Sequence, residues 1–160
     1  MEALTPISEL PYIDEHATVI VASANSVWSA LTDALDQALS GRGRASFSRI
    51  VGCSDCSASG PRPLAEGSTI PGFRVVTVVA GSELVLVGRH RFSSYALIFR
   101  LEQLSSSRSR LHAESRAAFP GVGGSVYRLL VIGTGGHMVA VRHMLSGIKR
   151  RSEPRTPSRT

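Results

Sequence analysis

Cysteine is scarce in this sequence, and the two cysteines do not form a recognisable site. Cys53 and Cys56 make a single C-x-x-C with no second pair. One such pair is weak evidence for zinc, and it lacks the strand–helix setting that lowers a redox thiol pKa. The spacing leaves open whether the two thiols pair. No other cluster of His, Cys and carboxylates stands out, so we predict neither a metal site nor a cofactor.

Long apolar runs are also absent. The longest uncharged stretch near the C-terminus, residues 129–141, has 13 residues, whereas a membrane-spanning helix needs about 20. The first ten residues, MEALTPISEL, lack the basic and apolar regions of a secretory signal. We therefore expect a cytoplasmic protein without a transmembrane segment.

Positive charge is concentrated at the C-terminus. The net charge is +6, yet residues 149–160 hold five Lys and Arg against one Glu, which leaves +2 for the rest. A basic tail can contact nucleic acid or an anionic membrane, but it is more often a solubilising end. We expect no nucleic-acid partner. The expected organisation is an extension over 1–10, one domain over 11–150 and a disordered basic tail over 151–160.

The first half of the chain alternates clear elements with irregular segments. β-Branched residues predict a strand over 12–22, and apolar residues at every fourth position predict an amphipathic helix over 23–40, capped by Ser23. A short strand is expected over 45–51. Residues 52–72 are rich in Gly, Pro and Ser, which is typical of a lid or binding loop.

From residue 73 onward the pattern is that of an antiparallel meander. Four segments of strand character, FRVVTVVA, ELVLVGRHRF, YALIFRLEQL and SRLHAESRAAF, are joined by short connections. One long helix is predicted after Pro120, with an apolar stripe over about six turns. That stripe consists of Tyr127, Val131, Thr134, Met138, Val141, Leu145 and Ile148. The fold class is therefore α+β, with helices on one side of a sheet.

The central hairpin, residues 82–104, indicates which face of the sheet is buried. A two-residue turn at Ser93 and Ser94 would pair His90 with Leu97 and Gly88 with Phe99 on one face. The opposite face carries most of the charges, so the first face points inward. On the next strand, Ser115 and its alternate neighbours also face inward. Gly and His on that face suggest either a filled core or the wall of a cavity.

Three features together resemble the helix-grip fold of the START/SRPBCC superfamily, which includes lipid-transfer domains and polyketide cyclases. They are the strand and helix start VIVASANSVWSALTD, the segment EGSTIPGF before the sheet, and the long C-terminal helix. The resemblance implies a curved antiparallel sheet wrapped around that helix, with a cavity between them. It carries over no catalytic residue, and fold alone does not fix function.

We predict that this cavity binds a small hydrophobic, lipid- or polyketide-like molecule. The predicted ligand-binding residues are Thr77, Gly88, His90, Tyr95, Leu97, Phe99, Ser115, Thr134 and Met138. An inward His is more often a neutral core residue bonded to a hydroxyl, here that of Ser115 or Tyr95. His137 flanks the helix stripe and could reach the cavity rim.

Two alternatives stay open. The first is an enzyme of the polyketide cyclase or dehydratase kind, with His90 and Tyr95 as proton-transfer groups; whether any reaction is catalysed does not follow from the sequence. The second is a partner-binding protein with a filled core. Ligand identity and oligomeric state also do not follow from the sequence.

Overall fold

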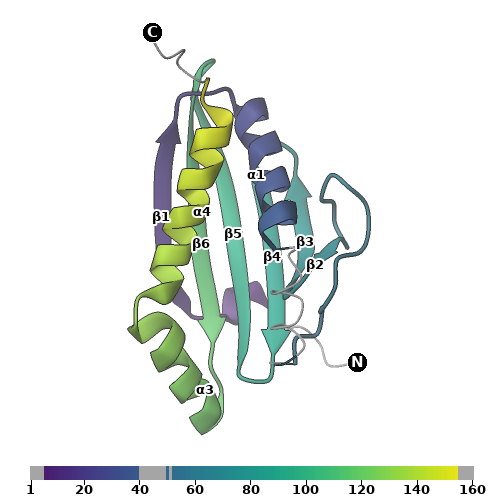
Figure 1. Cartoon of the computed structure of the whole chain (residues 1–160), viewed down its shortest axis with the longest axis vertical. Coiled ribbons are helices and arrows are strands. Elements are labelled where there is room, and N and C mark those ends of the chain that lie inside the picture. Colours follow the sequence, from purple (N-terminus) through teal and green to yellow (C-terminus); the bar gives the residue numbers. More distant parts are fainter. Residues whose placement is uncertain (1–5, 40–49, 51, 155–160) are drawn as a thin grey trace, which may run out of the picture.

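The molecule is built on one six-stranded antiparallel sheet in the order β1-β6-β5-β4-β3-β2 (Figure 1). The computed structural model describes residues 6–39, 50 and 52–154. The strands are β1 Tyr12–Ile20, β2 Thr69–Ile70, β3 Phe73–Val79, β4 Glu83–His90, β5 Ser93–Ser105 and β6 Arg108–Ala118. The predicted α+β class and antiparallel meander are confirmed. The short strand expected over 45–51 lies outside the described residues except for Ile50, which is helical.

Two helices cover one face of this sheet. Helix α1, Ala24–Leu39, and helix α4, Gly136–Ser152, lie side by side over it (Figure 1). The Ser26 amide donates to Ser23 Oγ at 3.3 Å, which confirms the predicted cap. Apolar side chains of both helices and of the strands form one core, which includes Val27, Leu31, Leu35, Leu84, Leu86, Phe99, Leu111, Val141, Leu145 and Ile148.

The predicted turn of the central hairpin is wrong: each residue of β4 pairs with a β5 residue four positions earlier than predicted. The predicted inner and outer faces of the two strands are right. His90 pairs with Ser93 and Gly88 with Tyr95, so the turn consists of Arg91 and Phe92. The Phe92 amide donates to His90 Nδ1 at 3.1 Å, and this bond stabilises the turn. Because a shift of four is even, each side chain keeps the face that alternation assigned to it.

The C-terminal helix is interrupted, contrary to the prediction of one continuous helix. It consists of α3, Gly121–Arg128, one π-helical turn η2, Leu129–Gly133, which continues α3, and α4. The helical backbone breaks at Gly135, which has a left-handed φ of 74° and directly precedes α4. The predicted stripe therefore does not continue across the break: Thr134 and Met138 are exposed, and His137 lies half-buried beside them.

The placement of Thr77 also departs from simple alternation. The pairing of β3 with β4 shifts between Val75 and Thr77, because Val76 forms a bulge. Val75 pairs with Leu86 of the inner face, whereas Thr77 pairs with Val85 of the outer face. One extra residue thus moves Thr77 away from the helices.

On the outer face, charge is paired. Glu114 is buried there, 2.6 Å from Arg100 Nη1 and 2.5 Å from Arg116 Nε. Burial would raise the pKa of Glu114, but the hydrogen bonds from both guanidinium groups outweigh burial and lower that pKa. The predicted assignment of the charged residues to the outer face is confirmed.

Helix α4 continues to Ser152, which is two residues into the segment 151–160 that the sequence assigns to a basic tail. The Val21 amide donates to Glu153 Oε1 at 3.0 Å. Residues 155–160, the rest of the predicted tail, lie outside the described residues, and the domain limits stay a prediction.

Candidate functional site

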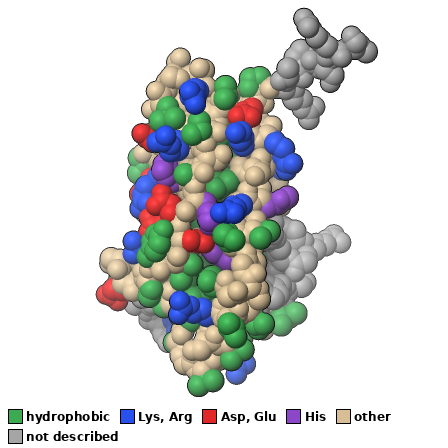
Figure 2. Space-filling view, turned by 90° about the vertical axis from the view of Figure 1, so that its left-hand side faces the viewer, with side chains coloured by type: hydrophobic (Ala, Val, Ile, Leu, Met, Phe, Trp, Pro, Cys, Tyr) green, Lys and Arg blue, Asp and Glu red, His purple; other side chains and the backbone are tan. Residues whose placement is uncertain are grey.

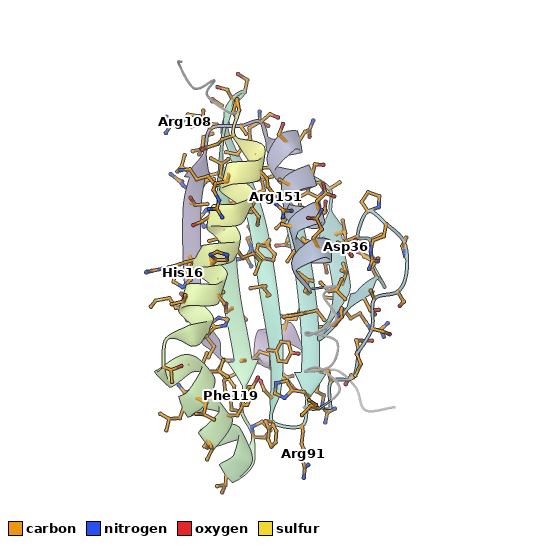
Figure 3. All side chains as sticks on the ribbon, in the orientation of Figure 1. His16, Asp36, Arg91, Arg108, Phe119 and Arg151 are labelled. Carbon is orange, nitrogen blue, oxygen red and sulfur yellow. The ribbon has the colours of Figure 1, made fainter. Side chains whose placement is uncertain are left out.

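A cavity of about 250 Å³ lies between the inner face of the sheet and the segment α3–η2. β4, β5 and β6 form one wall, and α3, η2 and the start of α4 form the other. The lining is mostly apolar and aromatic and includes Ile13, Cys53, Pro71, Phe73, His90, Tyr95, Leu97, Ser115, Ala117, Phe119, Tyr127, Val131, Ile132 and His137. Phe119 follows β6 at the end of the sheet nearest α3 (Figure 3).

Four of the nine predicted ligand-binding residues line this cavity: His90, Tyr95, Leu97 and Ser115. The other five lie elsewhere. Thr77 is on the outer face, Phe99 is buried in the core, and Gly88 lies beneath Tyr95. Thr134 is exposed and donates its hydroxyl to the Leu130 carbonyl of its own segment at 2.6 Å, and Met138 is also exposed. Ligand binding by any of these residues stays a prediction.

Tyr95 closes the floor of the cavity by lying across Gly88. A side chain at Gly88 would overlap with the Tyr95 ring and the Gly72 carbonyl oxygen. The Tyr95 hydroxyl donates to that same carbonyl at 2.7 Å. Burial, reinforced by the neighbouring Cys53 thiol, raises the pKa of Tyr95. Tyr95 is therefore a fixed neutral wall residue whose proton is already engaged.

His90 is a neutral hydrogen-bond donor. Because the Phe92 amide donates to Nδ1, that nitrogen is unprotonated and Nε2 carries the proton. Burial lowers the pKa of His90 below its usual 6.5. The ring packs edge-on against Tyr127, with centroids 4.8 Å apart, and lies 5.4 Å from the Tyr95 ring.

Because the pKa of His90 is lowered in the folded protein, the free energy of unfolding should fall in mild acid. The unfolded chain binds a proton at His90 more readily than the folded one, so the free energy of unfolding decreases as the pH falls below about 6.5. The loss is complete below the lowered folded-state pKa. We expect His90→Gln to flatten this part of the pH profile, measured by urea unfolding at a series of pH values. Parallel profiles for both proteins would contradict a lowered pKa.

The sequence analysis missed a polar cluster that adjoins the cavity. His137 Nε2 lies 2.9 Å from Ser115 Oγ and 3.5 Å from Asp14 Oδ1. Asp14 Oδ2 in turn lies 3.2 Å from His16 Nε2. Asp14 Oδ1 is buried without a hydrogen-bond partner among the described residues. An inward carboxylate therefore stands next to an imidazole and a hydroxyl.

This cluster is not arranged like a Ser-His-Asp triad. In such a triad the hydroxyl and the carboxylate contact opposite nitrogens of the imidazole, whereas here both contact Nε2 of His137. Nε2 of His137 exchanges a hydrogen bond with Ser115, and the Asp14 carboxylate lies beside the same nitrogen as a negative charge. Alternation places Asp14 and His16 on the same face of β1, which is the sequence pattern that indicates this cluster.

Aromatic rings and a thiol complete the wall. Tyr127 stacks on Phe92 with centroids 5.9 Å apart, and the pKa of Tyr127 is raised by burial and by Cys53. No disulfide links Cys53 to Cys56, and the Cys56 thiol donates to the Cys53 carbonyl oxygen at 2.7 Å. Cys53 and Pro71 from the two ends of the 52–72 loop reach the cavity. A role for this loop at the mouth stays a prediction.

Two other expectations concern metals and membranes. Among residues 6–39, 50 and 52–154, no group of three or more His, Cys, Asp or Glu residues is arranged to hold a metal ion. Within the same part of the chain, every helix is too short or too polar to cross a membrane.

Comparison with known proteins gives a match in structure but not in sequence. No protein-family model and no curated protein sequence matches the chain. The Zhui aromatase/cyclase from Streptomyces sp. R1128 superposes with a TM-score of 0.57 at 11% identity, covering 90% of this chain and 94% of that one. Protein CV1439 from Chromobacterium violaceum gives 0.55 at 13% identity, covering 91% and 100%.

A third solved structure names the superfamily directly. The START superfamily protein from Mycobacterium smegmatis has a TM-score of 0.52 at 12% identity and covers 88% of this chain and 98% of that one. At these identities the likeness establishes the fold and no activity. A curved antiparallel sheet with α1 and a C-terminal helix on one face is common to these proteins. This chain has the START/SRPBCC fold.

Proposed function

We propose that the cavity binds a small aromatic molecule that carries a hydrogen-bonding oxygen. The observation that supports this most directly is the composition of the wall. The Nε2–H donor of His90 and the polar pair Ser115–His137 lie among aromatic and aliphatic side chains. Such pockets take apolar ligands and orient them with a few polar groups.

The size of the cavity narrows the ligand class. Its volume of about 250 Å³ is below the range of about 300–1,000 Å³ that is usual for ligand pockets. A compact molecule of one or two fused rings suits this space better than a long acyl chain. The name of the Zhui neighbour, an aromatase/cyclase, agrees with an aromatic ligand.

A titration with 1-naphthol tests the proposal. This probe has two fused rings and one hydroxyl, and we expect saturable one-to-one binding with a Kd of roughly 10 µM to 1 mM, as its size permits. Isothermal titration calorimetry gives the stoichiometry. Heats that do not saturate, or that persist after the cavity is filled by mutation, would overturn the proposal.

An enzyme acting in the same cavity is a second candidate, and the His137 cluster favours it. His137 Nε2 would remove a proton from the carbon next to a ligand ketone. A C=C bond would form as the β-hydroxyl departs, and that hydroxyl would take the proton to leave as water. Asp14 would stabilise the transient imidazolium. Tyr95 is less suited to the predicted role in proton transfer, because its hydroxyl already donates a hydrogen bond to the Gly72 carbonyl oxygen.

Dehydration of 3-hydroxy-1-tetralone tests this second candidate, because the enone that forms tautomerises to the aromatic 1-naphthol by moving a proton from C4 to the ketone oxygen. We expect wild type to accelerate the reaction, followed by naphthol fluorescence, and His137→Ala to lose about 100-fold or more in rate while still binding 1-naphthol. His143→Ala is the matched control, because His143 is exposed on the same helix. If wild type bound 1-naphthol but did not accelerate the dehydration, the enzyme candidate would be wrong and only the binding function would remain.

The partner-binding hypothesis required a filled core. The cavity next to α3 weighs against it.

A further inference from the structure

Helix α3 and the turn η2 present an apolar stripe to solvent. Val122, Val126, Leu129 and Leu130 are 84%, 55%, 69% and 62% exposed. Their spacing of four, seven and eight residues places them on one side of a helix. Gly124 is buried, and Tyr127 and Val131 face the cavity from the other side. A soluble helix normally buries its aliphatic stripe, so this outward one needs a partner.

The charged residues that share chain segments with this stripe are cationic. Arg128 lies on α3 itself, and Arg91 is exposed at the turn of the β4–β5 hairpin, at the same end of the molecule (Figure 3). Residues 84–101 and 115–152, which contain the stripe and this turn, include no Asp or Glu. Figure 2 shows hydrophobic and cationic side chains together at the lower end of the molecule, where α3 lies.

We propose that the stripe of α3–η2 docks on an anionic membrane surface. Aliphatic side chains flanked by Arg suit a bilayer, because the chains enter the acyl boundary while the guanidinium groups remain at the head groups. A second copy of this chain fits less well, since its own Arg91 and Arg128 would be brought close.

Docking in this way would place the lipid surface beside the cavity. The same short segment contributes Tyr127 and Val131 to the cavity wall and Val126 and Leu130 to the exposed stripe. The proposal does not depend on a ligand in the cavity, so it stands or falls separately from the proposed function.

Co-sedimentation with vesicles tests the proposal on the full chain. We expect binding to phosphatidylcholine vesicles that contain phosphatidylglycerol, weaker binding to phosphatidylcholine alone, and weakening by salt. The double variant Val126→Asp, Leu130→Asp should lower the partition coefficient by more than about tenfold. The matched control is Val79→Asp, because Val79 is 50% exposed where β3 ends, far from α3 (Figure 1).

A second pair of variants separates charge from folding. Arg128→Gln should reduce the preference for phosphatidylglycerol, whereas Arg108→Gln at the opposite end should not (Figure 3). Thermal unfolding checks that each variant folds. The proposal is overturned if folded wild type stays in the supernatant with anionic vesicles, or if the Val126 and Leu130 substitutions leave binding unchanged. Concentration-dependent dimers that these substitutions abolish would instead assign the stripe to a second copy.

Discussion

Gly88→Ala should destabilise the protein by about 2–3 kcal/mol or more. The added Cβ would overlap with both the Tyr95 ring and the Gly72 carbonyl oxygen. Movement of Tyr95 relieves only the first of these contacts, and it breaks the hydrogen bond from its hydroxyl to Gly72. The second contact is with the backbone, so β4 and the end of the 52–72 loop must separate. Urea unfolding measures the loss.

Gly147→Ala is the matched control for this prediction. Gly147 lies within α4, and a Cβ there would meet nothing within 4 Å. Alanine is the better helix former, so this change should stabilise the protein by up to about 1 kcal/mol. If Gly88→Ala proved as harmless as Gly147→Ala, the close approach of Tyr95 and Gly72 over β4 would be wrong.

Ala117→Phe should abolish uptake of 1-naphthol, with affinity falling by about 100-fold or more because the ring takes the ligand's space. Ala117 is small, lies on the inner face of β6 and lines the cavity beside Phe119. A phenyl ring there occupies existing space and should cost little stability. Calorimetry and thermal unfolding of the same preparation measure the two effects separately.

The control for this substitution is Val79→Phe, which adds similar bulk at an exposed position of β3. It should bind 1-naphthol as wild type does. Wild-type affinity in Ala117→Phe would mean that the probe binds outside the cavity. Loss of binding together with loss of folding would be distinguished by the unfolding curve.

Local alternation in the sequence predicts the faces of the strands well. Leu111, Ala113 and Ser115 are buried on the inner face as expected. The same pattern does not determine register, because shifts of two or four residues leave every face unchanged. The hairpin turn depended instead on a bond between the Phe92 amide and the His90 ring, which residue patterns do not reveal.

The candidate site was less predictable than the fold, since it depends on irregularities. A single bulge at Val76 places Thr77 on the outer face. The break at left-handed Gly135 changes which side of α4 faces the cavity, so that His137 lines the cavity and Met138 does not. Asp14 and His137 come from opposite ends of the chain, so only the fold brings them together. Residues in regular segments, such as His90, Leu97 and Ser115, could be placed from the sequence.

The order of the strands also bears on how the protein avoids aggregation. β1 and β2 form the two edges of the sheet, where unpaired backbone groups could join another molecule. β2 has only two residues, and Ser59 of the 52–72 loop pairs with its Thr69. β1 has a register shift between Tyr12 and Asp14 and then charged residues. The charged side chains of β1 and the shortness of β2 therefore disfavour polymerisation by strand addition.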